Sequence, residues 1–153
     1  LLVMPAGAEA ESEYRKASHA NTKPAELEKL SKSLSSKVRV AVASNRRSSG
    51  ATLHALAKDS SMNVRIAVAT NLSTKDKTFL ILAKDKVTDV RRVTARFEYV
   101  PVDALTILAK DPDPDIRMEV AKNLNTLKKT LLLLTRDKHI EIRQTAHAAL
   151  SRK

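Results

Sequence analysis

Residues 59–71, DSSMNVRIAVATN, contain a pattern that returns along the chain at one fixed interval. The pair formed by Val or Ile and the following Arg recurs every 26 residues, at Val38-Arg39, Val64-Arg65, Val90-Arg91, Ile116-Arg117 and Ile142-Arg143. A fixed period of this length is typical of a tandem array of structural repeats. The apolar residues therefore serve a core that continues from repeat to repeat.

Five repeats follow from this period, spanning residues 23–48, 49–74, 75–100, 101–126 and 127–152. Each begins with two apolar residues three positions apart, which share one face of a helix: Leu27/Leu30, Leu53/Leu56, Phe79/Leu82, Leu105/Leu108 and Leu131/Leu134. Apolar residues three and four apart then predict a second helix, as in Val64, Val68 and Leu72 with the small Ala67 beside them. Residues 111–115, DPDPD, mark the turn between the helices, because two prolines stop a helix there.

Short polar residues stand where these helices begin and end. We expect hydroxyl side chains just before the first helix to cap its N-terminus, at Thr22, Ser48, Thr74 and Thr126. We expect amide side chains after the second helix to tolerate left-handed geometry and bond to loop backbone, at Asn45, Asn71 and Asn123.

The start of the chain departs from the repeat. Residues 1–12 are small and acidic without a period, which predicts a disordered or poorly ordered lead-in. Ser12 and Glu13 occupy the Val-Arg position of a degenerate N-terminal half repeat, as expected of a capping repeat. We expect residues 13–153 to form a single helical-repeat domain.

The residues Leu56-Ala57-Lys58-Asp59, Val64-Arg65, Val68-Ala69 and Asn71 resemble the leucine-rich repeat variant family and, more broadly, HEAT-like helical repeats. The resemblance covers about residues 23–152. It implies an all-α, right-handed α-solenoid (superhelix) of about five two-helix repeats plus the half repeat. In that family the second element can be a 3₁₀-helix, but the longer period here favours two α-helices. The iron–sulfur cluster of some family members cannot be transferred, because the chain has no Cys.

Composition excludes several kinds of site. The absence of Cys removes disulfides and thiolate ligands and fits a reducing, cytoplasmic setting. The longest leucine run, residues 131–134, and every other uninterrupted apolar run are far too short to span a membrane. With two Gly the chain has no glycine-rich phosphate loop, and the nearest candidate metal cluster, His139, Glu141 and His147, lacks ligand spacing. We therefore expect no cofactor, no metal and no enzymatic activity.

Acidic and basic residues recur in every repeat and invite two interpretations. The set is Asp59, Asp85, Asp111 and Asp137 with Arg39, Arg65, Arg91, Arg117 and Arg143. A catalytic or phosphate-binding site needs to occur only once, whereas recurrence favours a structural ladder. In such a ladder each carboxylate holds an arginine of its own or of an adjacent repeat.

The third repeat breaks the pattern and supplies candidate binding residues. Phe97 replaces the expected Asn, Thr94 replaces an apolar residue, and Tyr99 follows. An exposed Phe97/Tyr99 pair beside Arg92 and Arg96 would suit stacking on a partner. The alternative is that the aromatic side chain fills a locally altered junction.

Net charge suggests an acidic partner. The chain carries +11 at pH 7, but repeat 101–126 has three Lys or Arg against five Asp or Glu, which interrupts any continuous basic track. We expect a monomeric scaffold that binds an acidic macromolecule, with protein as the first hypothesis. Nucleic-acid binding is the second, through phosphate contacts by Arg92, Arg96, Lys122, Lys128 and Lys129. Surface charge that serves solubility is the third interpretation. A helical-repeat DNA glycosylase is a minor alternative, since few aromatic residues are present to line a base pocket.

Overall fold

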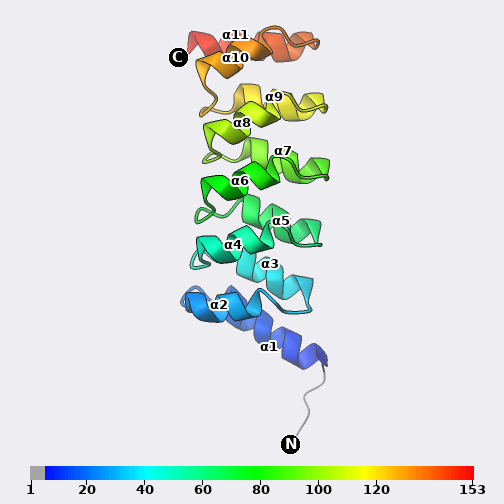
Figure 1. The fold of residues 1–153 in the computed structure, drawn as a ribbon, viewed down its shortest axis with the longest axis vertical. Coiled ribbons are helices and arrows are strands. Elements are labelled where there is room, and N and C mark those ends of the chain that lie inside the picture. The colour runs from blue at the N-terminus through cyan, green and yellow to red at the C-terminus, as the bar shows by residue number, and fades with distance from the viewer. Residues whose placement is uncertain (1–5) are drawn as a thin grey trace, which may run out of the picture. The chain divides into compact units, whose positions relative to one another are not determined.

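The computed structural model describes residues 6–153, and this part of the chain forms eleven helices and no strand (Figure 1). The all-α solenoid predicted from the 26-residue period is confirmed. Contacts divide the chain into two compact units, Leu1–Thr78 and Phe79–Lys153, which are described separately. The single domain expected for residues 13–153 stays a prediction.

Unit 1 alternates two kinds of helix. Its helices are α1 (Ala6–Ser18), α2 (Pro24–Leu30), α3 (Ser36–Ser44), α4 (Gly50–Leu56) and α5 (Met62–Ala69). The second helices of successive repeats contact one another, α1 with α3 and α3 with α5, while α2 and α4 pack against α3. Helix α6 (Asp76–Leu82) contains the division between the units.

Unit 2 continues the same alternation. Its helices are α7 (Thr88–Arg96), α8 (Val102–Leu108), α9 (Pro114–Lys122), α10 (Lys128–Leu134) and α11 (Ile140–Ser151). Helix α9 contacts α7 and α11, and α8 and α10 pack against α9. The second element of every repeat is an α-helix, as the period favoured.

The core lies where the sequence pattern places it. The five Val or Ile residues of the Val-Arg pairs are 0–2% exposed, so they share one environment. All ten apolar residues that pair at a spacing of three on the first helices are 0–6% exposed. Since each of these first helices has only seven residues, none is stable alone, and the burial of its apolar face by neighbouring helices holds it in place.

The predicted disordered lead-in is wrong for residues 6–12, because they form the first half of α1. Ala and Glu dominate this segment and have high helix propensity, and α1 packs against α3 with Ala17 fully buried. Residues 1–5 of the expected lead-in lie outside the described part of the chain.

The predicted role of the hydroxyl side chains is also wrong. Ser48, Thr74 and Thr126 donate to a carbonyl six residues earlier, at 2.6–2.7 Å, in the last turn of the preceding second helix. Thr22 does the same to the end of α1 at 2.5 Å. These hydroxyls cap the C-terminus of one helix instead of the N-terminus of the next. The N-cap of α4 is Ser49, whose Oγ accepts from the Thr52 amide at 3.1 Å.

We predict that Leu105→Ala lowers the free energy of unfolding by about 2–5 kcal/mol, because Leu105 is fully buried and truncation leaves a cavity. Chemical denaturation with circular dichroism measures the effect. Leu124→Ala is the matched control, since Leu124 is 76% exposed and should change stability by less than about 0.5 kcal/mol. Equal losses in both variants would contradict the stacked core.

Candidate binding surfaces

Arginines of the second helices bridge consecutive repeats. Arg39 donates from Nε and Nη2 to both carboxylate oxygens of Asp59, at 2.7 and 3.0 Å, across 20 residues. In unit 2 the same bidentate contact joins Arg91 to Asp111 at 2.7 and 3.1 Å, and Arg117 to Asp137 at 2.6 and 3.1 Å. Of the two partners left open by the sequence, each of these arginines takes the Asp of the following repeat.

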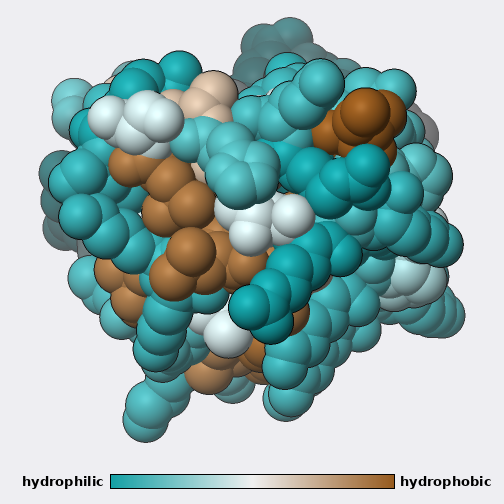
Figure 2. Space-filling view, turned by 90° about the horizontal axis from the view of Figure 1, so that it is seen from above, coloured by the Kyte–Doolittle hydropathy of each residue, from teal (hydrophilic) through white to brown (hydrophobic). Residues whose placement is uncertain are grey.

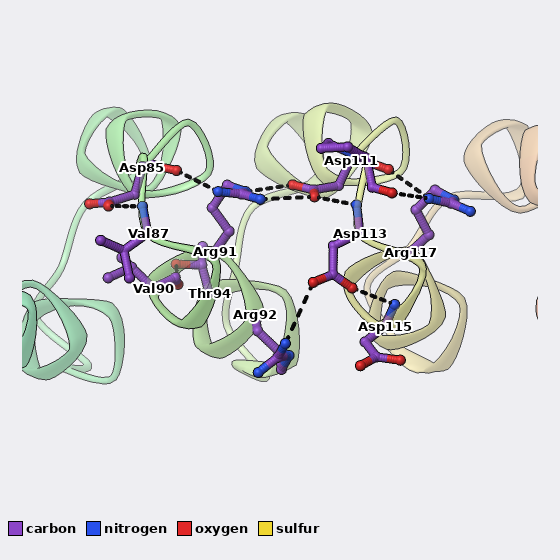
Figure 3. Close-up of polar contacts among 11 residues, drawn as sticks. Asp85, Val87, Val90, Arg91, Arg92, Thr94, Asp111, Asp113, Asp115 and Arg117 are labelled. Carbon is purple, nitrogen blue, oxygen red and sulfur yellow. Dashed lines mark hydrogen bonds and ion pairs between the residues drawn. The ribbon is translucent and has the colours of Figure 1, made fainter.

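The same guanidinium also holds the turn of its own repeat. Nη1 of Arg117 donates to the carbonyls of Asp111 and Pro112, at 2.8 and 3.1 Å. The Asp111 side chain accepts from the Asp113 amide at 3.0 Å, so the carboxylate that receives Arg91 also orders its own turn (Figure 3). We call this series of contacts the Arg–Asp ladder. It ties each interhelix turn to the next turn within a unit.

The ladder keeps the carboxylates of Asp59 and Asp137 ionised. Burial would raise the pKa of Asp59, but hydrogen bonds from Arg39 and the Ser61 amide outweigh it and hold that pKa below its usual value. The Arg117 hydrogen bond lowers the pKa of Asp137 against the opposing effect of burial. The hydrogen bond to Asp137 likewise raises the pKa of Arg117, against the effect of burial. Such groups exchange protons poorly near neutral pH, which suits structural ion pairs better than acid–base catalysis.

The half repeat keeps the ladder geometry with different chemistry. Glu13 occupies the arginine position of α1, and Ser33 occupies the aspartate position 20 residues later. Ser33 Oγ donates to Glu13 Oε2 at 2.5 Å. The departure seen in the sequence therefore preserves the contact while it reverses the direction of donation.

A second ladder runs along the turns between repeats. Asn45, Asn71 and Asn123 each donate from Nδ2 to two carbonyls of the preceding repeat, 26 and 28 residues earlier, at 2.6–3.1 Å. Each side-chain oxygen accepts from the amide two residues later, at 2.8–2.9 Å. The expected left-handed conformation is wrong, because no non-glycine residue between 6 and 153 has a positive φ. The amides act as cross-links between repeats.

The aromatic candidates have different roles. Phe97 stacks on the buried Phe79 with ring centroids 5.9 Å apart, and Tyr99 meets the Phe97 ring edge-on at 5.8 Å. Phe97 is half-buried, whereas Tyr99 is 61% exposed. Phe97 thus fills the altered junction, and Tyr99 is the member of the pair that a partner could contact.

The structure pairs three of the candidate cations with acids on their own surface. Arg92 lies 2.8 Å from Asp89 and 3.5 Å from Asp113, with its Nη2–Asp113 pair visible in Figure 3. Arg96 and Lys122 share Glu119, at 3.7 and 4.0 Å. These carboxylates partly neutralise the positive charge that would attract a phosphate group.

Lys128 and Lys129 differ from the other candidate cations. Both lie in the first turn of α10 and are exposed. Neither has an ion pair with any residue that the structure describes.

Unit 1 contains a groove that sequence reasoning missed. A hollow of about 870 Å³ runs over the second-helix face, lined by Tyr14 of α1, Lys37 and Val40 of α3, Arg46 of the next turn and Asn63 of α5, with smaller residues between them. Lys37 Nζ lies 4.2 Å from the centroid of the Tyr14 ring. No Asp or Glu lines the groove. It therefore offers apolar, amide and cationic groups, and Lys37 Nζ also lies 3.6 Å from Oε2 of Glu11, a carboxylate outside the lining.

Small side chains create this groove. Ala41 and Ser44 of α3 lie in its wall. At the equivalent positions of unit 2 stand larger or charged residues: Val93 and Arg96 in α7, Glu119 and Lys122 in α9. A comparison of outer-face positions between repeats would have revealed this difference from the sequence.

Two further properties concern only residues 6–153. No three His, Asp or Glu side chains come together there in a way that could hold a metal ion. Each helix in that range is too short or too polar to cross a bilayer.

Comparison with solved structures places the fold among helical repeats. A leucine-rich repeat variant with a repetitive structural motif superposes with a TM-score of 0.67 at 22% identity over 86% of this chain. The chain spans 52% of the length of that protein. No family model and no curated protein matches the sequence. The predicted resemblance is therefore confirmed at the level of fold.

Designed armadillo repeat proteins share the architecture. One, solved in complex with the peptide (KR)4, matches with a TM-score of 0.55 at 17% identity over 96% of this chain and 94% of its own. Another matches with a TM-score of 0.51 at 13% identity over 97% of this chain and 94% of its own. The chain is a helical-repeat solenoid.

We predict that Asp137→Asn destabilises the fold by about 3 kcal/mol at neutral pH, because Arg117, only 8% exposed, would lose its counter-charge. Denaturant unfolding measures the loss. Asp103→Asn is the control, since Asp103 is exposed on α8 and lies outside the ladder. A loss no larger than that of the control would show that the ladder contributes little.

Acid should remove the contribution of Asp137. The folded-state pKa of Asp137 is depressed, so the unfolded chain, with an Asp pKa of about 3.9, takes up the proton first. The stability gap between the wild type and Asp137→Asn should be full above about pH 5 and shrink as pH falls through the folded pKa. Unfolding curves from neutral to acidic pH test this. A gap that does not change with pH would contradict it.

Proposed function

We propose that this solenoid is a non-catalytic scaffold that binds an acidic macromolecular partner, and that the partner is a protein. The groove of unit 1 carries the proposal, because its charged lining residues are Lys37 and Arg46, and the carboxylate that pairs with Lys37, Glu11 at 3.6 Å, is half-exposed and lies outside the lining. A protein segment with acidic side chains would find complementary charge there.

The mixed lining favours a peptide chain over a simple polyanion. Tyr14 and Val40 offer apolar surface, and Asn63 is an exposed amide that can bond to a peptide backbone. A designed armadillo repeat protein of the same fold class was solved with the basic peptide (KR)4. The groove here has the opposite charge preference, so we propose an acidic extended segment as its ligand.

The proposal that the chain is not an enzyme has separate support. The recurring acids and arginines are engaged with each other in the ladder, with carboxylate pKa values lowered at Asp59 and Asp137. Release of free base from damaged DNA by the purified chain would contradict this part of the proposal.

Nucleic-acid binding is the second candidate. The exposed Lys128 and Lys129 favour it, together with the net charge of +11. The pairing of Arg92, Arg96 and Lys122 with nearby acids weakens it.

We predict that Lys37→Glu combined with Arg46→Glu weakens binding of a labelled acidic octapeptide, (Asp-Glu)4, at least about tenfold. Each charge reversal replaces an attraction by a repulsion in the groove. Fluorescence anisotropy at about 0.1 M salt measures the affinity. Lys128→Glu combined with Lys129→Glu is the matched control, because it changes net charge equally outside the groove.

The control variants also separate the two candidates. An equal loss in both double variants would mean nonspecific attraction by net charge. Tighter binding of a DNA or RNA oligonucleotide, lost with Lys128 and Lys129, would favour the nucleic-acid candidate. Tyr99→Ser tests the aromatic site of unit 2 and keeps both Phe79 and Phe97, and a loss confined to this variant would move the peptide site there.

A further inference from the structure

The outer face of α10 and α11 exposes apolar side chains at positions that neighbouring helices cover elsewhere. Leu132 and Leu133 are 56% and 45% exposed. The equivalent residues one repeat earlier, Thr106 and Ile107, are half-buried, and the Thr106 hydroxyl lies 3.3 Å from the Thr130 hydroxyl of the following repeat. Figure 2 looks onto the α10–α11 pair and shows a hydrophobic patch within a hydrophilic rim. Single exposed leucines are common, but this adjacent pair lies at the positions that the following repeat covers elsewhere in the chain.

Arg143 on the same helix pair is arranged as a ladder arginine. Its Nη1 donates to the carbonyls of Asp137 and Lys138, at 2.7 and 3.1 Å. Arg117 makes the same two contacts with its own turn and uses Nε and Nη2 to bind the carboxylate of Asp137. Among residues 6–153, Nε and Nη2 of Arg143 have no hydrogen-bond partner. Nη1 therefore anchors the guanidinium to its own turn, and Nε and Nη2 can donate to a carboxylate in the bidentate manner of Arg117.

We propose that the α10–α11 face docks a further two-helix repeat whose interhelix turn carries an aspartate. The carboxylate would take the bidentate side of Arg143, as Asp137 takes that of Arg117. Apolar residues of the incoming helices would cover Leu132 and Leu133. The pairing of one charge-assisted contact with one apolar contact is the seam that this chain already uses between its own repeats.

A second copy of this chain fits the face poorly. The N-terminal turn of the described chain has Ser33 in place of the aspartate, and Ser33 Oγ already donates to Glu13. It has no carboxylate at that position to offer to Arg143. The chemistry of the face therefore selects an aspartate-bearing repeat over self-association.

The test extends the 153-residue chain at Lys153. A copy of residues 102–126 follows Lys153, so that Lys153 takes the place of Pro101 and the copied Asp111 lies 20 residues after Arg143, the ladder separation. We expect one cooperative thermal transition with a midpoint several degrees above that of the unextended chain. Replacement of the copied Asp111 by Asn should lower the midpoint of the extended chain by about 2–4 °C. In an extended chain that also carries Arg143→Gln, the Asp and Asn extensions should have equal midpoints.

Three outcomes would overturn the proposal. An extension that melts separately and below the rest of the chain would show that the face does not accept a repeat. Equal midpoints for the Asp and Asn extensions would show that Arg143 does not select a carboxylate. A dimer of the unextended chain in light scattering, abolished by Leu132→Ser with Leu133→Ser, would assign the face to a second copy.

Discussion

The stacking of the repeats depends on the contacts made by the arginine of the Val-Arg and Ile-Arg pairs. Its guanidinium has five donors in a rigid fork, which a lysine ammonium cannot imitate. Arg117 directs one nitrogen to the carbonyls of its own turn and two to the carboxylate of the next. The turns are tied together on one edge by these contacts and on the other by the asparagine amides. Short helices, such as the seven-residue α8 and the nine-residue α9, therefore stack in a fixed register within each unit.

The outer face varies while this framework stays constant. Small side chains in unit 1 leave a groove whose charged lining residues are Lys37 and Arg46. In unit 2 the corresponding surface is filled by ion pairs around Glu119 and Asp113. The Arg–Asp ladder and the asparagine cross-links determine where the outer side chains lie, but they do not determine what those side chains bind. The binding role therefore has to be argued from the variable positions.

The fold could be predicted from the 26-residue period because the burial of the apolar side chains follows the same period. Val64 and Leu105 occupy positions that are apolar in every repeat and have the same buried environment in each one. Their burial could therefore be predicted without coordinates. The hydroxyl caps could not, since Ser48 lies between two helix ends and the sequence does not say which one it serves. The groove was missed because it comes from the absence of side-chain volume at Ala41 and Ser44. The pairing of Arg92 with Asp113 needed the packing of α7 against α9.

A double-mutant cycle between Arg91 and Asp111 tests the central claim most directly. The two side chains are 13% and 4% exposed and 2.7 Å apart, in the middle of unit 2. Arg91→Gln, Asp111→Asn and the double variant, compared by denaturant unfolding, isolate the energy of their interaction. The account predicts a favourable coupling of about 1.5–3 kcal/mol. A coupling near zero would show that the Arg–Asp contact does not hold the repeats together.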